Sequence, residues 1–170
     1  LWKHTPLQTT FGVIMLGIVG GRPRVLTLAE VLEQFLEFRR EVVQRRTEFD
    51  LRKALARAHI LEGLKIALNQ LDAIIKLIRG SKAPAEARAG LMSGFSLTRL
   101  QAQAILDMQL QRLTGLEQQK IVDELTELLK TIEQLRSVLG SDTLLLENVL
   151  NELRAVREKF GDDRRSEFVD

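Results

Sequence analysis

Side chains able to do chemistry are few and widely separated in this sequence. Its 170 residues contain no Cys and no Tyr, and two His, at positions 4 and 59. Disulfides, thiolate metal sites and a tyrosine nucleophile are therefore excluded within it. The sequence also lacks phosphate-binding loops, HExxH zinc motifs and EF-hand calcium loops. Acidic pairs occur only as neighbours on predicted helix surfaces, without the cleft that general acid–base catalysis needs. We therefore predict no catalytic residue, no cofactor-binding residue and no metal ligand.

His59 stands between basic and apolar positions, in the segment Arg57-Ala58-His59-Ile60-Leu61. One interpretation is a partly buried imidazole that is hydrogen-bonded to a neighbour. The alternative is a pH switch or a ligand, because an imidazole changes its charge near neutral pH. We prefer the first interpretation.

A run of basic residues is the strongest functional candidate by charge. Glu41 precedes Arg45 by four positions, and Glu48 precedes Arg52 in the same way, which is the orientation that supports a solvated helix. The run is therefore either a solvated face or a surface that contacts nucleic-acid phosphates without sequence preference. The candidate residues are Arg39, Arg40, Arg45, Arg46, Arg52 and Lys53.

The composition indicates a globular or coiled-coil protein rather than a disordered one, with 45% hydrophobic and 28% charged residues. A formal net charge of +2 is too small to establish nucleic-acid binding. No apolar run approaches the roughly 20 residues that a membrane helix requires, so we expect no membrane contact. The absence of Cys is compatible with a reducing cytoplasm. Both ends look like cuts within a longer protein.

The elements that must position these side chains are mostly helices. Apolar residues recur in alternating three- and four-residue steps, which is the coiled-coil spacing. They predict a mainly α fold: a long antiparallel coiled-coil stalk, a small globular helical head, and short β-strands near the N-terminus. The expected parts are a base with strands (1–27), a first long helix with a bent continuation (28–80), the head (81–115), a returning long helix (116–140), and a base helix with a polar tail (141–170).

Local signals set the expected boundaries. Two short strands are predicted on either side of a turn at Gly20-Gly21-Arg22-Pro23, although Arg22-Pro23-Arg24 is also a weak candidate for contact with phosphate or a neighbouring domain. Capping boxes are predicted at Thr27–Glu30, Thr98–Gln101 and Thr114–Glu117. A short helix is expected from Pro84 to about Met92, ended by Gly94, and Asp142 is expected to cap the last helix.

Three aromatic residues, Phe35, Phe38 and Phe49, fall on the apolar stripe of the first long helix. We therefore predict that they belong to a core and do not stack on bases.

Several strings in order resemble one family. They include LWKHT (1–5), TTFG (9–12), GRPR (21–24), HILEGL (59–64), QAQAILDM (101–108) and RLTGLE (112–117). Together they resemble the A subunit of bacterial DNA gyrase, a type IIA topoisomerase, over essentially the whole chain. The related topoisomerase IV subunit is the close competitor, and RLTGLE favours gyrase. Gly20 stands where an acidic residue is common in the family, and Ser96 stands where Gly is common.

The resemblance implies a coiled-coil tower that ends in a dimerisation domain, the exit gate through which the transported DNA duplex leaves. It implies an ATP-dependent type II topoisomerase that changes DNA supercoiling, with its catalytic tyrosine, ATP and magnesium sites outside this sequence. The implied partners are a second copy through the gate, the gyrase B subunit in an A2B2 enzyme, and transient double-stranded DNA. The implied location is the bacterial cytoplasm, in association with the nucleoid, and the fragment should be inactive alone.

Within this family assignment, we expect a two-fold apolar contact in the segment 97–113. The residues predicted to form this interface or to support it are Leu97, Ala102, Ile105, Leu106 and Leu113. A different class of function, a non-enzymatic coiled-coil adaptor that binds a partner along the stalk, would depend little on this segment.

Overall fold

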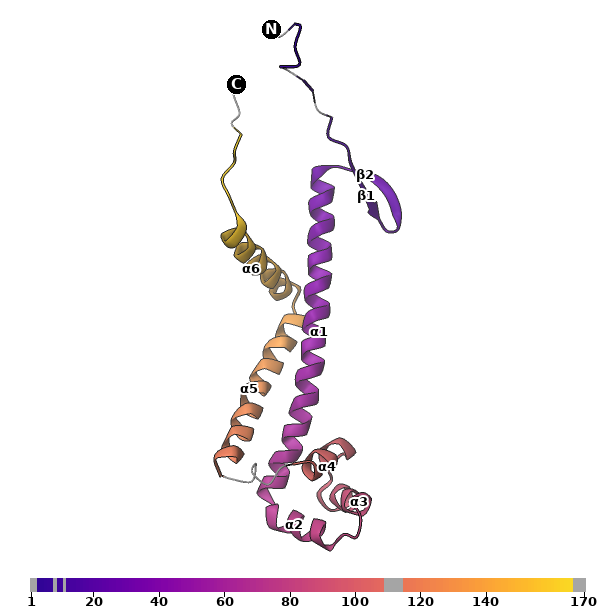
Figure 1. The fold of residues 1–170 in the computed structure, drawn as a ribbon, viewed down its shortest axis with the longest axis vertical. Helices are drawn as coiled ribbons and strands as arrows, with labels where there is room; N and C mark the ends of the chain where they lie inside the picture. The colour runs from indigo at the N-terminus through magenta and orange to yellow at the C-terminus, as the bar shows by residue number, and fades with distance from the viewer. Residues whose placement is uncertain (1–2, 8, 11, 109–114, 167–170) are drawn as a thin grey trace. The chain divides into compact units, whose positions relative to one another are not determined.

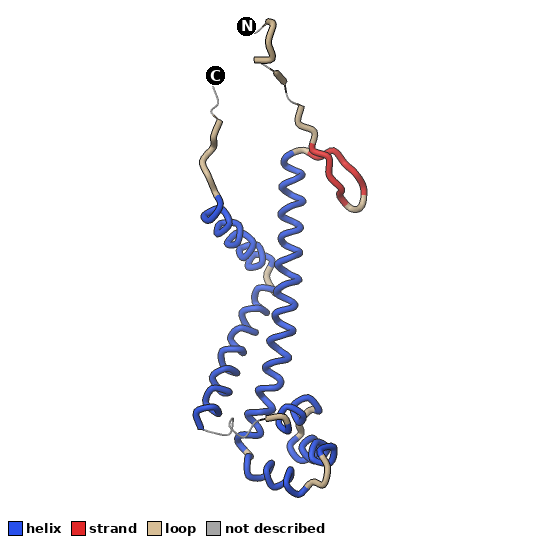
Figure 2. Tube along the Cα trace, viewed as in Figure 1, coloured by secondary structure: helices blue, strands red, loops and turns tan. Residues whose placement is uncertain are grey.

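The computed structural model describes residues 3–7, 9–10, 12–108 and 115–166 (Figure 1). These residues are mainly helical, with a small antiparallel sheet near the N-terminus, as predicted (Figure 2). They form two compact units, Leu1–Val43 and Gln44–Asp170. The long helix α1 (Leu28–Asn69) contributes to both units.

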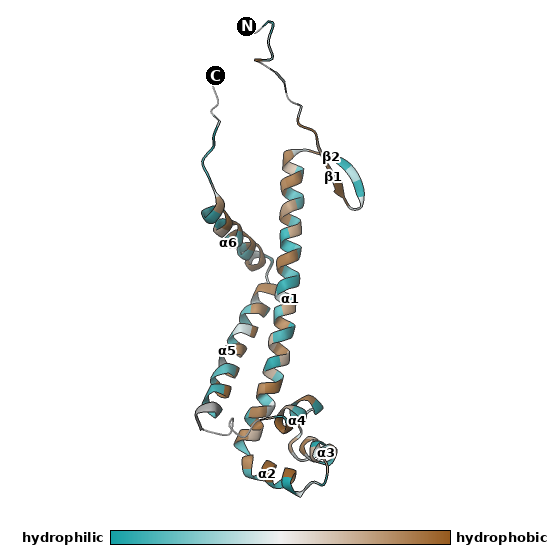
Figure 3. Ribbon diagram, viewed as in Figure 1, coloured by the Kyte–Doolittle hydropathy of each residue, from teal (hydrophilic) through white to brown (hydrophobic). Residues whose placement is uncertain are grey.

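The first unit contains a hairpin of strands β1 (Met15–Val19) and β2 (Arg22–Leu26), joined through Gly20 and Gly21. The two glycines have φ values of +59° and +77°, which is what a tight hairpin turn with two positive φ angles requires. Figure 3 shows β1 as hydrophobic and β2 as largely hydrophilic, so the two strands of the hairpin differ in hydropathy.

The predicted turn was too long. Arg22 and Pro23 lie in β2, paired with Val19 and Ile18. The two glycines complete the turn by themselves, and proline is tolerated in a strand whose outer edge needs no donor. The first strand begins at Met15.

Helix α1 begins at the predicted capping box. The Thr27 backbone N–H donates to Glu30 Oε2 at 2.7 Å, and the Glu30 N–H donates to Thr27 Oγ1 at 3.3 Å. The hydrogen bond from the Thr27 backbone is the main reason why the pKa of the Glu30 carboxyl lies below its ordinary value. The helix then continues for 42 residues, a rise of roughly 60 Å at about 1.5 Å per residue.

The interpretation of Phe35, Phe38 and Phe49 as core residues is wrong. Their exposed fractions are 47%, 59% and 57%. The stripe through Phe49 continues one heptad later to Ala56, which is exposed, whereas α1 packs through Ala54 and its neighbours. The aromatic stripe is therefore not the buried one.

In the second unit, α5 (Gly115–Leu139) runs back along the latter part of α1 in the opposite direction (Figure 1). We call α1 from residue 44 onward together with α5 the stalk pair. One buried cluster joins this pair to the shorter helices; its members include Ala54, Ala58, Leu61, Leu64, Ile74, Leu91, Ile121, Leu125 and Ile132.

Three short helices follow the end of α1: α2 (Leu71–Gly80), α3 (Pro84–Phe95) and α4 (Arg99–Leu106). We call them the α2–α4 cluster. The break between α1 and α2 falls at Gln70. The predicted capping box of α4 is present, with both Thr98 and Gln101 making their reciprocal hydrogen bonds.

Two predicted helix boundaries need correction, and a third lies outside the described residues. Helix α3 continues through Gly94 to Phe95 and ends at Ser96, which has a left-handed φ of 52°. The last helix, α6 (Asp142–Phe160), is capped by Ser141, whose side chain accepts from the Leu144 N–H, rather than by Asp142. Ser141 supplies this acceptor from one position earlier, just outside the helix. The box predicted at Thr114 lies outside the described residues.

Ser96 provides a test of backbone strain at the end of α3. Its left-handed conformation is unfavourable for a side chain with a Cβ atom, and glycine adopts it without that cost. We expect Ser96→Gly to stabilise the chain by about 1 kcal/mol in urea denaturation. Ser93→Gly is the matched control, because Ser93 lies inside α3 and glycine weakens a helix interior by roughly 0.5 kcal/mol relative to serine. Equal shifts of the two midpoints would contradict this account.

Candidate functional site

Most of the predicted interface residues lie in the core of the chain itself. Leu97, Ala102 and Ile105 are only 4%, 0% and 4% exposed. They belong to the buried cluster described above, and the half-buried Leu106 packs against it. Leu113 lies outside the described residues. Leu97, Ala102 and Ile105 are therefore core residues of the chain itself, and their predicted part in an interface stays a prediction.

Sequence reasoning missed the apolar residues that this region leaves exposed. Leu100 on α4 is 68% exposed, Met92 on α3 is 39% exposed, and Ile75 on α2 is 37% exposed. Leu100 and Ala102 are two positions apart, so they point to nearly opposite sides of α4. The sequence did contain a signal for this exposure: Leu100 does not fall at the three- or four-residue spacing that relates the buried residues of α4.

A polar network joins α4 to α1. The Gln101 side chain, 6% exposed as a residue, donates from Nε2 to the His59 backbone oxygen at 2.7 Å. Its Oε1 accepts from the Thr98 backbone N–H at 3.0 Å. The Thr98 Oγ1 lies 2.8 Å from His59 Nε2. His59 is half-buried and hydrogen-bonded, which agrees with the first of its two interpretations.

Gly63 allows the two helices to come this close. A Cβ atom at Gly63 would lie 2.6 Å from both Cβ and Cγ of Gln101. Real side chains do not accept such a distance, so α4 would have to move. The glycine is therefore required by a close approach inside a regular helix, and it is not a hinge.

The six basic candidates do not form one face. Arg39 and Arg40 belong to the first unit and are half-buried, whereas the other four belong to the second unit and are exposed. Arg46 forms an ion pair with Glu152 of α6. Positions 45 and 52 share one side of α1, and 46 and 53 share another, because residues seven apart nearly coincide in an α-helix.

A further basic residue, Arg57, connects the stalk pair. Its guanidinium donates to both carboxylate oxygens of Glu124 on α5, at 2.7 and 2.9 Å. This contact raises the pKa of Arg57 above its ordinary value. The two side chains are 43% and 46% exposed, so the pair contributes about 1 kcal/mol or less to stability. It fixes the register of the two helices more than it stabilises them.

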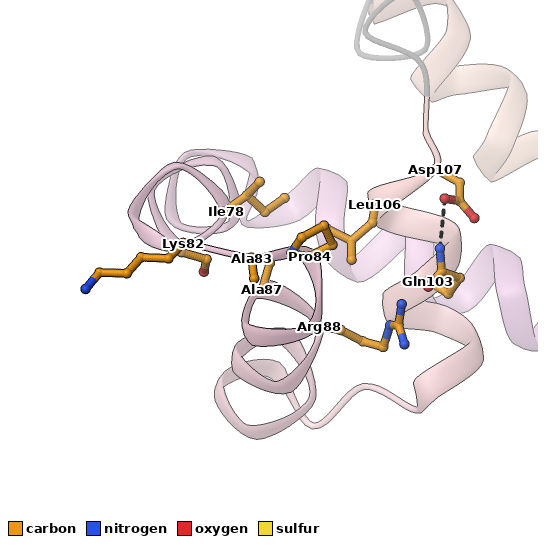
Figure 4. Close-up of a pocket in the computed structure, with 10 residues that line it drawn as sticks. Ile78, Lys82, Ala83, Pro84, Ala87, Arg88, Gln103, Leu106 and Asp107 are labelled. Carbon is orange, nitrogen blue, oxygen red and sulfur yellow. Dashed lines mark hydrogen bonds between the residues drawn. The ribbon is translucent and has the colours of Figure 1, made fainter.

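A cavity of about 420 Å³ opens within the α2–α4 cluster (Figure 4). Its polar lining includes Arg88, Gln103 and Asp107, and the Gln103 amide donates to Asp107 Oδ1 at 2.8 Å. Ser81, also in the lining, donates its hydroxyl hydrogen to the Leu77 backbone oxygen. The Ser81 hydroxyl and the Asp107 carboxylate are thus each hydrogen-bonded to a nearby group. The lining does not place a nucleophile beside a base.

A family model for the A subunit of DNA gyrase/topoisomerase IV matches residues 1–154. The chain belongs to this family of DNA gyrase/topoisomerase IV A subunits. Similar proteins in the family include the DNA gyrase A subunit of Clostridium acetobutylicum, 55% identical over 98% of this chain, and that of Deinococcus deserti, 56% identical over 100% of it. The DNA gyrase A subunit of Staphylococcus epidermidis is 53% identical over 99% of the chain.

The chain spans about a fifth of the length of these relatives, 20%, 21% and 19% respectively. It therefore corresponds to one region of an A subunit of this family. None of the described helices is long and apolar enough to cross a membrane. Within the described ranges, no three His, Asp or Glu side chains gather into a group that could hold a metal ion.

The contact at Gly63 generates a test with a matched control. We expect Gly63→Ala to destabilise the chain by about 1–3 kcal/mol, because the new methyl group collides with Gln101. Gly80→Ala makes the same chemical change in α2, where nothing lies within 4 Å of the added Cβ. That variant should be neutral or more stable, by up to about 1 kcal/mol. Urea midpoints that move together in the two variants would show that the collision is relieved at no cost.

Proposed function

We propose that this chain is the exit-gate and dimerisation region of a DNA gyrase A subunit. The full enzyme would be an ATP-dependent type II topoisomerase that passes one DNA duplex through another and changes supercoiling. Membership of the family supports this proposal, as do relatives named as DNA gyrase A subunits at 52–56% identity. These names favour gyrase over topoisomerase IV.

The proposed work of this region is mechanical. Without a tyrosine or a cysteine, the chain supplies neither the nucleophile that would cleave DNA nor a covalent lock between two copies. It would hold a gate closed by a reversible contact and release it when a duplex presses through. In the full A2B2 enzyme, ATP and magnesium would be bound outside this chain, and the assembly would act on DNA in the bacterial cytoplasm.

The observation that supports the gate assignment is the difference in burial between the two sides of α4. Its inner side is anchored in the core by Ala102 and Ile105, while Leu100 is 68% exposed on the other side. A leucine held out to solvent by a well-packed helix is a suitable anchor for an isologous contact, in which the same patch of two copies meets. Met92 on α3 and Ile75 on α2 are exposed apolar residues as well, at 39% and 37%.

The stalk would contact DNA through exposed basic residues of α1. Arg45, Arg52 and Lys53 are exposed there, and Arg46, also exposed, is paired with Glu152. Contacts from such residues are electrostatic and carry no sequence preference. They would suit a duplex that passes by and does not remain bound.

Self-association tests the gate. We expect the chain to dimerise in the micromolar range by sedimentation equilibrium, and Leu100→Asp to weaken the dimer by at least about tenfold, which corresponds to roughly 1.4 kcal/mol. Leu146→Asp is the control, since Leu146 is also exposed, at 49%, but lies on α6. Ile105→Asp is a poor substitute, because it would put a charge into the core. An unchanged dimer in Leu100→Asp, with a normal circular dichroism spectrum, would place the interface elsewhere.

Salt dependence tests the stalk contact with DNA. For a short duplex, we expect replacement of Arg52 and Lys53 by Ala to reduce the slope of log K against log salt by about 0.9 for each phosphate that is no longer neutralised. Arg79→Ala, which replaces an exposed arginine of α2, should leave the slope unchanged. If all variants keep the slope of the original chain, the basic run is only a solvated face.

A further inference from the structure

The buried amide of Gln101 lies at the boundary between α4 and α1. It belongs to the cap of α4, yet its shortest hydrogen bond leaves that helix: Nε2 donates to the His59 backbone oxygen at 2.7 Å. The second hydrogen of the same amide faces His59 Nδ1 at 3.5 Å. A capping box by itself needs neither contact.

Thr98 has the same double role. Its Oγ1 accepts from the Gln101 backbone N–H at 3.3 Å, which caps α4, and it also lies 2.8 Å from His59 Nε2. A neutral imidazole with its proton on Nε2 satisfies every contact, since Nε2 then donates to Thr98 and Nδ1 accepts from Gln101. Thus the cap of α4 and the side chain and backbone of His59 form one closed network.

We infer that Gln101 is the positioning residue that holds α4 on α1, so that the α2–α4 cluster and the adjoining stalk move as one body. The movement of this body in an opening gate rests on the function proposed above, whereas the attachment of α4 to α1 does not. Gln101 acts through His59 and Thr98, and nothing in this inference requires it to contact DNA or a second copy.

Directional contacts are needed here because the apolar contacts do not define a register. Ala102 and Ile105 share one buried cluster with Leu61 and Leu64, and the hydrophobic effect that stabilises such a cluster is non-directional. A hydrogen bond to a backbone oxygen is different, because displacement leaves buried polar groups unsatisfied. Gly63 completes the arrangement by removing the Cβ atom that would push Gln101 away.

The test is Gln101→Glu in the 170-residue chain, followed by hydrogen–deuterium exchange. The replacement keeps the size of the side chain and the acceptor for the Thr98 N–H, so the cap of α4 survives. It removes the donor to the His59 oxygen. At pH 8 we expect exchange to rise roughly tenfold in α4 and in residues 59–63 of α1, as follows when a buried carbonyl loses its partner.

The location of the change is a readout that general destabilisation would not produce. The excess exchange should be confined to α4 and to residues 59–63 of α1, while α5 and α6 keep the exchange of the original chain.

Gln134→Glu is the matched control, because Gln134 is exposed on α5. It should leave exchange in α4 and in residues 59–63 unchanged. The inference is overturned if Gln101→Glu exchanges like the original chain, if its excess exchange extends equally over α5 and α6, or if Gln134→Glu produces the same pattern.

Thr98 variants decide the matter if Gln101→Glu does not fold. Thr98→Ser keeps the hydroxyl and should preserve protection, whereas Thr98→Val should raise exchange both in α4 and in residues 59–63. A rise confined to α4 would mean that Thr98 only caps its own helix, and the attachment would be refuted. Residues 59–63 of α1 lie outside the proposed contact at Leu100, so their exchange reports the attachment, whereas sedimentation tests the gate.

Discussion

The close approach of α4 to α1 is the constraint on which the second unit of this chain depends. At Gly63 the two helices are too close for even a methyl group to fit, and the Gln101 amide uses this proximity to reach the His59 backbone. Around this contact, Leu61, Leu91 and Ile105 complete a common core. The stalk pair and the α2–α4 cluster are therefore parts of one packed unit.

This arrangement suits a component that must move without losing its shape. In the proposed gate, the joint between stalk and cluster would transmit displacement, while the exposed Leu100 would provide a contact that can separate. These two tasks would fall on different sides of α4, because Ala102 is buried and Leu100 is exposed. The ion pair of Arg57 with Glu124 lies at the surface and adds orientation more than stability.

Much of the secondary structure could be predicted, because its signals are local. The Thr27–Glu30 and Thr98–Gln101 boxes are defined by residues three positions apart, so the starts of α1 and α4 were correct. Errors arose where one local signal competed with another. Gly20 and Gly21 made the whole hairpin turn without Arg22 and Pro23, and Ser96 ended α3 beyond Gly94 by taking a left-handed conformation.

By itself, the sequence determined the helical class, the long first helix, the lack of thiol and tyrosine chemistry, and the family. Each depends on composition, periodicity or ordered strings of residues. Only the tertiary structure decided which apolar residues are buried: Phe49 is exposed and Ala54 is not. It also revealed that Gln101 serves a second helix as well as its own cap. Periodicity describes one helix at a time, whereas burial and cross-helix hydrogen bonds depend on which faces of two helices meet.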